Sequence, residues 1–201
     1  MLLVHRWAVV LVLLALAGCT VDTTEPLSDP VTTAPDVSLY GHWVQKDATS
    51  EIHAFIGKHT TKDNPNSIME IVKITRNTDD KQIEAGPTGY FTVSRVGNTS
   101  YMNLLAEKGD SKLSLSQAGS YAKWAKNDKK RCAVRRYKCD GMKLQVWTAK
   151  TPREALKKLS EAGEVKMIDE VVTADSLVRY LQKAGGEVLF NELLETWSKV
   201  P

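Results

Sequence analysis

A run of basic residues with aromatic side chains among them suggests binding chemistry. The basic residues are Lys123, Lys126, Lys129, Lys130, Arg131, Arg135, Arg136 and Lys138. Trp124 and Tyr137 lie within the run, and Asp128 is its one acidic residue. Such a set could bind the phosphates of lipid A, phospholipid headgroups or a phosphorylated glycan. The alternative, which we favour from sequence, is a solvated loop and an edge strand, where lysines discourage pairing with other molecules.

Two cysteines in the same region leave two structures open. In an oxidising compartment Cys132 and Cys139 would form a disulfide, and closing so short a loop stabilises a protein by about 2–3 kcal/mol on a chain-entropy argument. If residues 132–139 form one straight strand, however, the two ends lie about 23 Å apart, which is too far for a bond. The sequence does not choose between these alternatives.

The histidines are the remaining candidates for metal binding. His42, His53 and His59 could act with Asp63, but their spacing matches no metal-binding motif, so scattered histidines are the favoured interpretation. The sequence also has no Gly-x-Ser-x-Gly, no His-Glu-x-x-His and no phosphate-binding loop. We therefore expect neither a metal nor another cofactor, and an enzyme is the least favoured class of function.

The amino terminus has the pattern of an export signal. His5 and Arg6 precede an uncharged apolar run, residues 7–16, and the small residues Ala17 and Gly18 follow it. The run is about half the roughly 20 residues that a membrane-spanning helix needs. Its length is typical of the apolar part of a secretory signal peptide.

The end of this run resembles the lipobox of bacterial lipoproteins. Leu16-Ala17-Gly18-Cys19 carries the resemblance, which covers residues 1–19. It implies that residues 1–18 are removed, that the Cys19 thiol is joined to a diacylglycerol, and that the new amino terminus is acylated, for example with palmitate. Two or more acyl chains anchor a protein stably, whereas one binds only marginally. Thr20, in place of Asp, resembles lipoproteins that enteric-type bacteria send to the outer membrane.

Residues 19–36 are expected to form the lipidated cysteine and a disordered tether. Residues 20–36 contain three prolines, five threonines and four acidic residues, with no basic residue. Such a segment cannot build a core, and proline extends it by up to about 3.1 Å per residue. The remaining residues, 37–201, are predicted to form a single domain. Their 26 basic and 20 acidic side chains give a net charge of +6, which is compatible with an anionic partner.

Alternating and β-branched segments predict strands through the first two thirds of this domain. The expected strands are residues 38–44, 50–56, 67–75, 90–96, 99–107, 112–116, 131–139 and 142–149. The clearest hairpin turns at Gly97-Asn98, where a type II′ turn would pair Val96 with Thr99. Asp140-Gly141 predicts a second hairpin. Residues 117–130 are ambiguous between helix and loop.

The pattern changes to helices near the carboxyl end. Thr151-Pro152-Arg153-Glu154 is a capping box with proline at the first helical position. The helix that it begins should end at Gly163. A strand is expected over residues 164–172, a second helix over 174–184, and a last strand over 195–200.

Tyr40-Gly41-His42-Trp43, at the first strand, suggests a point where the fold closes tightly. Gly41 and Trp43 match the Gly-x-Trp of lipocalin-like barrels, which this segment resembles. The expected fold is mainly β (α+β), an antiparallel lipocalin-like barrel or half-barrel with two short C-terminal helices. The helix–strand–helix unit departs from standard lipocalins, which carry one helix after the barrel.

Two functions therefore stand ahead of an enzyme. The first is an envelope lipoprotein that binds a hydrophobic or amphipathic ligand, such as a lipid or an envelope glycan. The second is a module that binds an envelope protein, in assembly, in exclusion of incoming elements or in inhibition of a foreign enzyme. A hollow barrel would favour the first and a filled barrel the second. An exported lipoprotein rarely meets nucleic acid, so nucleic acid is not an expected partner.

Overall fold

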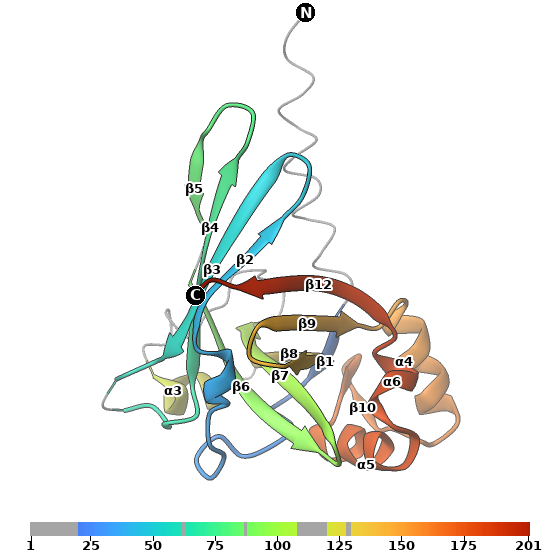
Figure 1. Ribbon diagram of the computed structural model, residues 1–201. Coiled ribbons are helices and arrows are strands. Elements are labelled where there is room, and N and C mark those ends of the chain that lie inside the picture. The colour runs from blue at the N-terminus through green and yellow to red at the C-terminus, as the bar shows by residue number, and fades with distance from the viewer. Residues whose placement is uncertain (1–19, 62, 87, 108–119, 128–129) are drawn as a thin grey trace, which may run out of the picture.

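The fold is built around a closed antiparallel barrel of eight strands (Figure 1). A computed structural model describes residues 20–201 apart from 62, 87, 108–119 and 128–129. The barrel strands are β2 (Gly41–Lys46), β3 (Ser50–Lys58), β4 (Met69–Asn77), β6 (Gly89–Val96), β7 (Thr99–Glu107), β8 (Lys130–Cys139), β9 (Lys143–Thr148) and β12 (Glu192–Lys199). Each pairs with the next in this order, and β12 closes the ring by pairing with β2. The predicted antiparallel barrel is confirmed, whereas the strand expected over 112–116 lies outside the described residues.

Turn chemistry sets the register of the two clearest hairpins. Val96 pairs with Thr99 in the β6–β7 hairpin, as predicted, and Gly97 has the positive φ (58°) that the first central position of a type II′ turn requires. Gly141 likewise has a positive φ (89°) in the β8–β9 turn. The alternation predicted for β9 is also observed, because Leu144 is buried and Trp147 lies on the opposite face.

The barrel closes where β12 meets the start of β2. A 3-10 helix, η2 (Val37–Leu39), leads into β2, and Trp43 pairs with Lys199 across the closure. Gly41 has φ 126°, and a Cβ there would lie 3.0 Å from Cε of Lys199, so glycine suits this position. The Trp43 indole Nε1 donates a hydrogen bond of 2.7 Å to the Leu39 carbonyl. The tight closure that the sequence suggests at this segment is therefore present.

The predicted disordered tether is wrong for residues 20–36, which pack against the barrel. A short strand, β1 (Val21–Thr23), pairs antiparallel with the first half of β8, while the second half of β8 pairs with β9. Val21 is fully buried, and the Leu27 amide donates to the Asn103 side chain at 3.1 Å. The low apolar content of residues 20–36 suggested disorder. In the structure Val21 and Leu27 are buried, and β1 pairs with the half of β8 that β9 leaves free.

Short helices and strands lie outside the barrel, most of them on one side of it, with α3 on the opposite side (Figure 1). They are α3 (Tyr121–Ala125), α4 (Pro152–Glu161), α5 (Ala174–Ala184), α6 (Gly186–Leu189), β10 (Met167–Ile168) and β11 (Val171–Val172). The predicted start of α4 is confirmed, although Thr151 makes no side-chain capping bond. The single strand predicted over 164–172 is wrong, because positive φ angles at Asp169 and Glu170 fold it into a hairpin.

Two hairpins, β2–β3 and β4 with β5 (Ile83–Ala85), project from one end of the barrel (Figure 1). β5 pairs only with the outer part of β4, while β6 pairs with residues at the base of β4. Within the part of the chain that the structure describes, no helix is both long and apolar enough to cross a membrane.

Candidate functional site

The interior of the barrel is filled by side chains. Trp43, Phe91 and Trp197 are buried within it, and they pack with smaller apolar residues from the other barrel strands. The buried members of this cluster are Leu39, Trp43, Ala54, Ile56, Met69, Phe91, Val93, Met102, Tyr137, Leu144, Val146 and Trp197. They occupy the space in which a hollow barrel would hold an apolar ligand.

A charged cluster completes this interior packing. Glu195 accepts a hydrogen bond of 3.0 Å from the Trp197 indole and lies 3.4 Å from the Lys73 ammonium group, which sits 5.1 Å from the Trp197 ring centre. Burial raises the pKa of Glu195, but the charges of Lys73 and Arg135 and these hydrogen bonds outweigh it, so the pKa is lowered overall. Arg135 lies on the inward strand face that it shares with Tyr137, and its Nε is buried without a hydrogen bond to a described residue.

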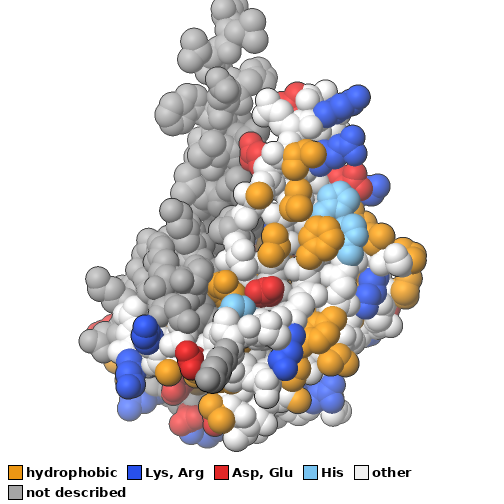
Figure 2. Space-filling view, turned by 90° about the vertical axis from the view of Figure 1, so that its left-hand side faces the viewer, with side chains coloured by type: hydrophobic (Ala, Val, Ile, Leu, Met, Phe, Trp, Pro, Cys, Tyr) orange, Lys and Arg blue, Asp and Glu red, His pale blue; other side chains and the backbone are white. Residues whose placement is uncertain are grey.

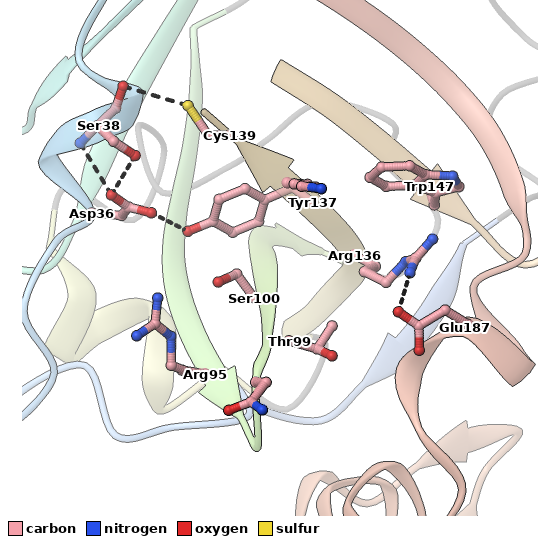
Figure 3. A pocket seen from close by; sticks show the side chains of 12 residues that line it. Asp36, Ser38, Arg95, Thr99, Ser100, Arg136, Tyr137, Cys139, Trp147 and Glu187 are labelled. Atoms are coloured by element: carbon pink, nitrogen blue, oxygen red, sulfur yellow. Dashed lines mark hydrogen bonds and ion pairs between the residues drawn. The ribbon is translucent and has the colours of Figure 1, made fainter. Parts of the chain in front are cut away.

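A polar cleft opens at the mouth of the barrel, beside η2 and the β6–β7 turn (Figure 3). Its volume is about 380 Å³, and a second cleft of about 280 Å³ adjoins it behind residues 33–36. The first is lined by Asp36, Ser38, Arg95, Asn98, Thr99, Ser100, Arg136, Tyr137, Lys138, Cys139, Trp147 and Glu187. Three of these residues are cations and two are carboxylates, so the lining has a net positive charge.

One wall of the cleft is fixed by hydrogen bonds to Asp36. The Tyr137 hydroxyl donates to Asp36 at 2.7 Å, and the Ser38 amide and hydroxyl donate at 3.0 and 2.6 Å. Burial raises the pKa of Asp36, but these hydrogen bonds and the charge of Arg95 outweigh it and hold the pKa below its usual value. Burial, with the Asp36 carboxylate beside it, raises the pKa of Tyr137. The hydrogen bond between Tyr137 and Asp36 therefore fixes residues 33–38 across the barrel mouth.

The opposite wall is formed by Arg136 on the outer face of β8. Its guanidinium carbon lies 4.2 Å from the centre of the Trp147 ring, and one terminal nitrogen donates to Glu187 at 2.6 Å (Figure 3). The Arg136 side chain is 13% exposed and that of Glu187 is 69% exposed. The Arg136 Nε is buried and has no hydrogen-bond partner among the described residues. Lys138 follows on the same strand face and lies exposed in the cleft.

The structure divides the basic stretch that the sequence presents as one run. Lys123 and Lys126 are exposed at α3, the Lys130 ammonium group binds the Ala125 carbonyl, and the Arg131 guanidinium donates to the Lys130 carbonyl at 2.7 Å. Arg135 faces the interior, and Lys129 lies outside the described residues. Of the seven basic residues of this stretch that the structure describes, strand alternation brings only Arg136 and Lys138 to the cleft. The edge-strand interpretation is wrong, because β8 has neighbours on both sides.

Arg95 is the cleft cation that the sequence analysis missed. It lies near the end of β6 and pairs with Ser100 across the hairpin whose register was predicted. Ser100 in turn pairs with Tyr137 on β8. That second pairing joins segments far apart in the chain, so it could not be derived from the local pattern.

The structure also shows the positions of the two cysteines and the three histidines considered in the sequence analysis. Cys132 and Cys139 are free thiols, both on the continuous strand β8, which selects the second of the two alternatives. Burial raises the pKa of Cys132 well above its usual value. His42 and His53 meet across β2 and β3, with 2.8 Å between Nε2 and Nδ1, whereas His59 pairs with Glu70 at 3.0 Å.

The outer face of these strands carries histidine beside apolar side chains (Figure 2). His42 stacks on Phe55, with 4.4 Å between the ring centres. Within the described residues no three or more His, Cys, Asp or Glu side chains come together as metal ligands, and Asp63 joins none of the histidines. The predicted lipidation site, Cys19, lies outside the described residues.

Comparisons with family models, with curated proteins and with solved structures find no match to this chain. The fold and the site therefore define its class without a relative. It is an eight-stranded antiparallel barrel, an architecture compatible with a lipocalin-like barrel, with a filled interior and a basic cleft at its mouth.

Proposed function

We propose that this protein is a lipid-anchored binding protein of the cell envelope that holds an amphipathic ligand at the mouth of its barrel. A β-barrel fold is compatible with ligand binding. The observation that carries the proposal is the position of the hollow space, because the interior is packed while a cleft of about 380 Å³ opens at the rim. Pockets that combine polar groups with an aromatic wall suit ligands that are themselves part polar and part apolar.

The filled interior favours an amphipathic ligand over a purely hydrophobic one. A hydrophobic ligand inside the barrel would have to displace buried residues such as Trp43, Phe91 and Met102. Removing that packing costs several kcal/mol, which binding would have to recover. A ligand at the rim can place its polar end on the cationic cleft and its apolar part on Trp147 or outside the protein.

Anchoring through Cys19 would hold the barrel directly against the bilayer. Val21 begins a strand of the fold only two residues after Cys19, a reach of about 7 Å. The ordered residues 20–36 therefore add no flexible spacer. An amphipathic ligand drawn from the membrane would then have a short path to the cleft. Thr20 supports the outer membrane as the location, with the body facing either the periplasm or the surface.

Native mass spectrometry on protein purified from cells that express the full chain tests this function. A co-purifying lipid or glycolipid is expected, together with saturable binding of fluorescent amphipaths that falls when Arg95 and Arg136 are replaced by Gln. A ligand-free mass with no saturable binding would contradict the proposal. Cys19→Ser should release the protein from washed membranes, and membrane retention of that variant would exclude the proposed anchor.

A protein partner is the second candidate. The filled interior is the outcome that the sequence analysis took to favour it, and apolar side chains are exposed on the outer face of the projecting hairpins. Phe55 is 42% exposed and Ile83 is 69% exposed. Crosslinking in cells would distinguish the two candidates. A protein crosslink that is lost in Phe55→Ser but kept in Arg136→Gln would favour a protein-interaction module, whereas the reverse pattern favours the cleft.

A further inference from the structure

We infer that the polar end of the ligand is a phosphate group that binds beside Arg136 and Lys138 and displaces the Glu187 carboxylate. This inference rests on the proposed function, since it names the chemistry of a ligand at the same cleft. Three features of the cleft support it: the fixed position of Arg136, the exposure of Glu187 and the balance of charges (Figure 3).

Arg136 is held in place before any ligand binds. Its guanidinium group stacks on Trp147 and is largely shielded from water, so its position does not depend on the ion pair alone. One terminal nitrogen binds Glu187, while the buried Nε has no partner among the described residues. A guanidinium group fixed in this way is suited to an oxyanion that accepts two parallel hydrogen bonds once Glu187 has left.

Glu187 has the properties of a replaceable internal anion. It belongs to the four-residue helix α6, its side chain is mostly exposed, and one carboxylate oxygen makes the contact with Arg136. Exposed ion pairs add little to stability, so releasing Glu187 into water costs the fold little. A ligand phosphate offers more acceptor oxygens than this single contact.

The charges of the cleft fit a dianion. At one end the charge of Arg95 contributes to the lowered pKa of Asp36, so these two groups offset each other. At the other end Arg136 and Lys138 face one carboxylate, Glu187, and Lys138 has no ion-pair partner among the described residues. Displacing Glu187 leaves two positive charges, which matches a phosphate ester above its second pKa of about 6.

The strand geometry allows both cations to serve one phosphate. Arg136 and Lys138 are alternate residues on one face of β8, about 7 Å apart along the strand, and the long, exposed Lys138 side chain can reach towards the fixed guanidinium group of Arg136. Thr99 and Ser100 line the same cleft and add hydroxyl donors. Arg135, the other arginine with an unpaired Nε, faces the packed interior instead and lines neither cleft.

Calorimetry on the purified full chain tests the inference with inorganic phosphate, with sulfate, and with phosphatidylcholine vesicles that either contain or lack phosphatidic acid. Phosphate should bind, and Arg136→Gln should weaken binding about tenfold, because a charge-assisted contact is lost. Glu187→Gln should tighten binding several-fold, because the competing internal anion is removed. The exposed pair Arg153 and Glu170, 3.1 Å apart, supplies the matched controls Arg153→Gln and Glu170→Gln, which should change nothing.

The pH dependence of binding distinguishes phosphate from other anions. Phosphate binding should weaken from about pH 7.5 to about pH 5.5 as the dianion is protonated, whereas sulfate, which keeps its charge, should not weaken. The titratable and charged groups facing the site are Asp36, Arg95, Arg136, Tyr137, Lys138, Cys139 and Glu187, and no histidine lines the cleft among the described residues. Equal weakening of both anions would overturn the assignment to phosphate.

The remaining outcomes are each decisive. Binding to phosphatidic acid vesicles alone identifies a lipid headgroup, and binding to inorganic phosphate alone identifies a soluble phosphate. If Glu187→Gln leaves binding unchanged or weakens it, the displacement is wrong, and this variant does not alter the Trp147 packing that Arg136→Gln disturbs. If no phosphate binds while mass spectrometry finds a ligand whose binding requires the cleft residues, the inference fails and the proposed function stands. If neither is found, both fail.

Discussion

The barrel interior and the barrel mouth are built from the same strands but have opposite properties. The interior is apolar and packed, and its carboxylate, Glu195, is matched by nearby cations. The mouth is polar and hollow, and its exposed carboxylate, Glu187, can be removed without opening the core. The difference teaches that closure of a barrel does not by itself decide where a ligand binds. The size of the inward side chains decides whether the interior has room for one.

Strand β8 shows how the two regions arise from one segment. Tyr137 points inward, where it packs in the core and binds Asp36, while Arg136 points outward onto Trp147. Side chains of a strand alternate between its faces, so neighbouring residues in the sequence belong to different regions. A substitution of Tyr137 should therefore affect mainly stability, and a substitution of Arg136 should affect mainly binding.

The largest effect on stability is expected from the core. Trp43→Ala should lower the free energy of unfolding by about 3–5 kcal/mol, because it leaves a cavity and an unpaired Leu39 carbonyl. Urea denaturation measures this change. Trp147→Ala, at the mouth, should cost less stability but weaken phosphate binding, by no more than the roughly tenfold loss expected for Arg136→Gln, because it removes only the ring that supports Arg136. Equal losses of stability in the two variants would contradict the distinction between the regions.

A charge placed in the buried part of the amino-terminal segment should lower the free energy of unfolding by about 3 kcal/mol or more. Val21→Asp places a charge in a fully buried position of β1, which strongly destabilises a fold. Val31→Asp is the matched control, because Val31 belongs to the same segment and is exposed. Thermal or urea unfolding of the two variants tests the ordered segment. If Val21→Asp is as stable as Val31→Asp, residues 20–36 are a tether after all.

A smaller effect is expected at the hydrogen bond that fixes the cleft wall. Tyr137→Phe should lower stability by about 1–2 kcal/mol near neutral pH, because a bond to an ionised carboxylate is lost. The folded-state pKa of Asp36 is lowered, so its contribution is present above the unfolded-state pKa and is lost as pH falls through the folded-state pKa. The difference between Tyr137→Phe and the original chain should therefore shrink below about pH 4. A difference that grows on acidification would exclude this role for Asp36.

The two thiols should differ in how fast they react with a thiol reagent. A thiol reagent should modify Cys139 in the folded protein and reach Cys132 only on unfolding, because Cys132 is buried and its pKa is raised. Denatured, non-reduced protein should contain two free thiols if Cys19 is lipidated. A count of zero would indicate a disulfide, and a count of three would indicate an unmodified Cys19.

The sequence predicted local structure better than the assembly of its parts. The β6–β7 register followed from Gly97, and the start of α4 followed from Pro152, because turn and cap chemistry depend on adjacent residues. The filled interior could not be predicted, because it depends on which strands face one another across the barrel. The order of residues 20–36 was missed for the same reason, since the strand edge that they pair with lies more than a hundred residues away.

The contrast between interior and mouth is tested most directly by nuclear magnetic resonance during titration with a soluble short-chain phosphatidic acid. The backbone amides of Thr99, Arg136 and Lys138 should shift on saturation, while the methyl groups of core residues such as Val93 and Leu144 should keep their positions. Shifts of the core methyl groups, with the amides at the mouth unchanged, would show that the ligand enters the barrel and would contradict a binding site at the rim.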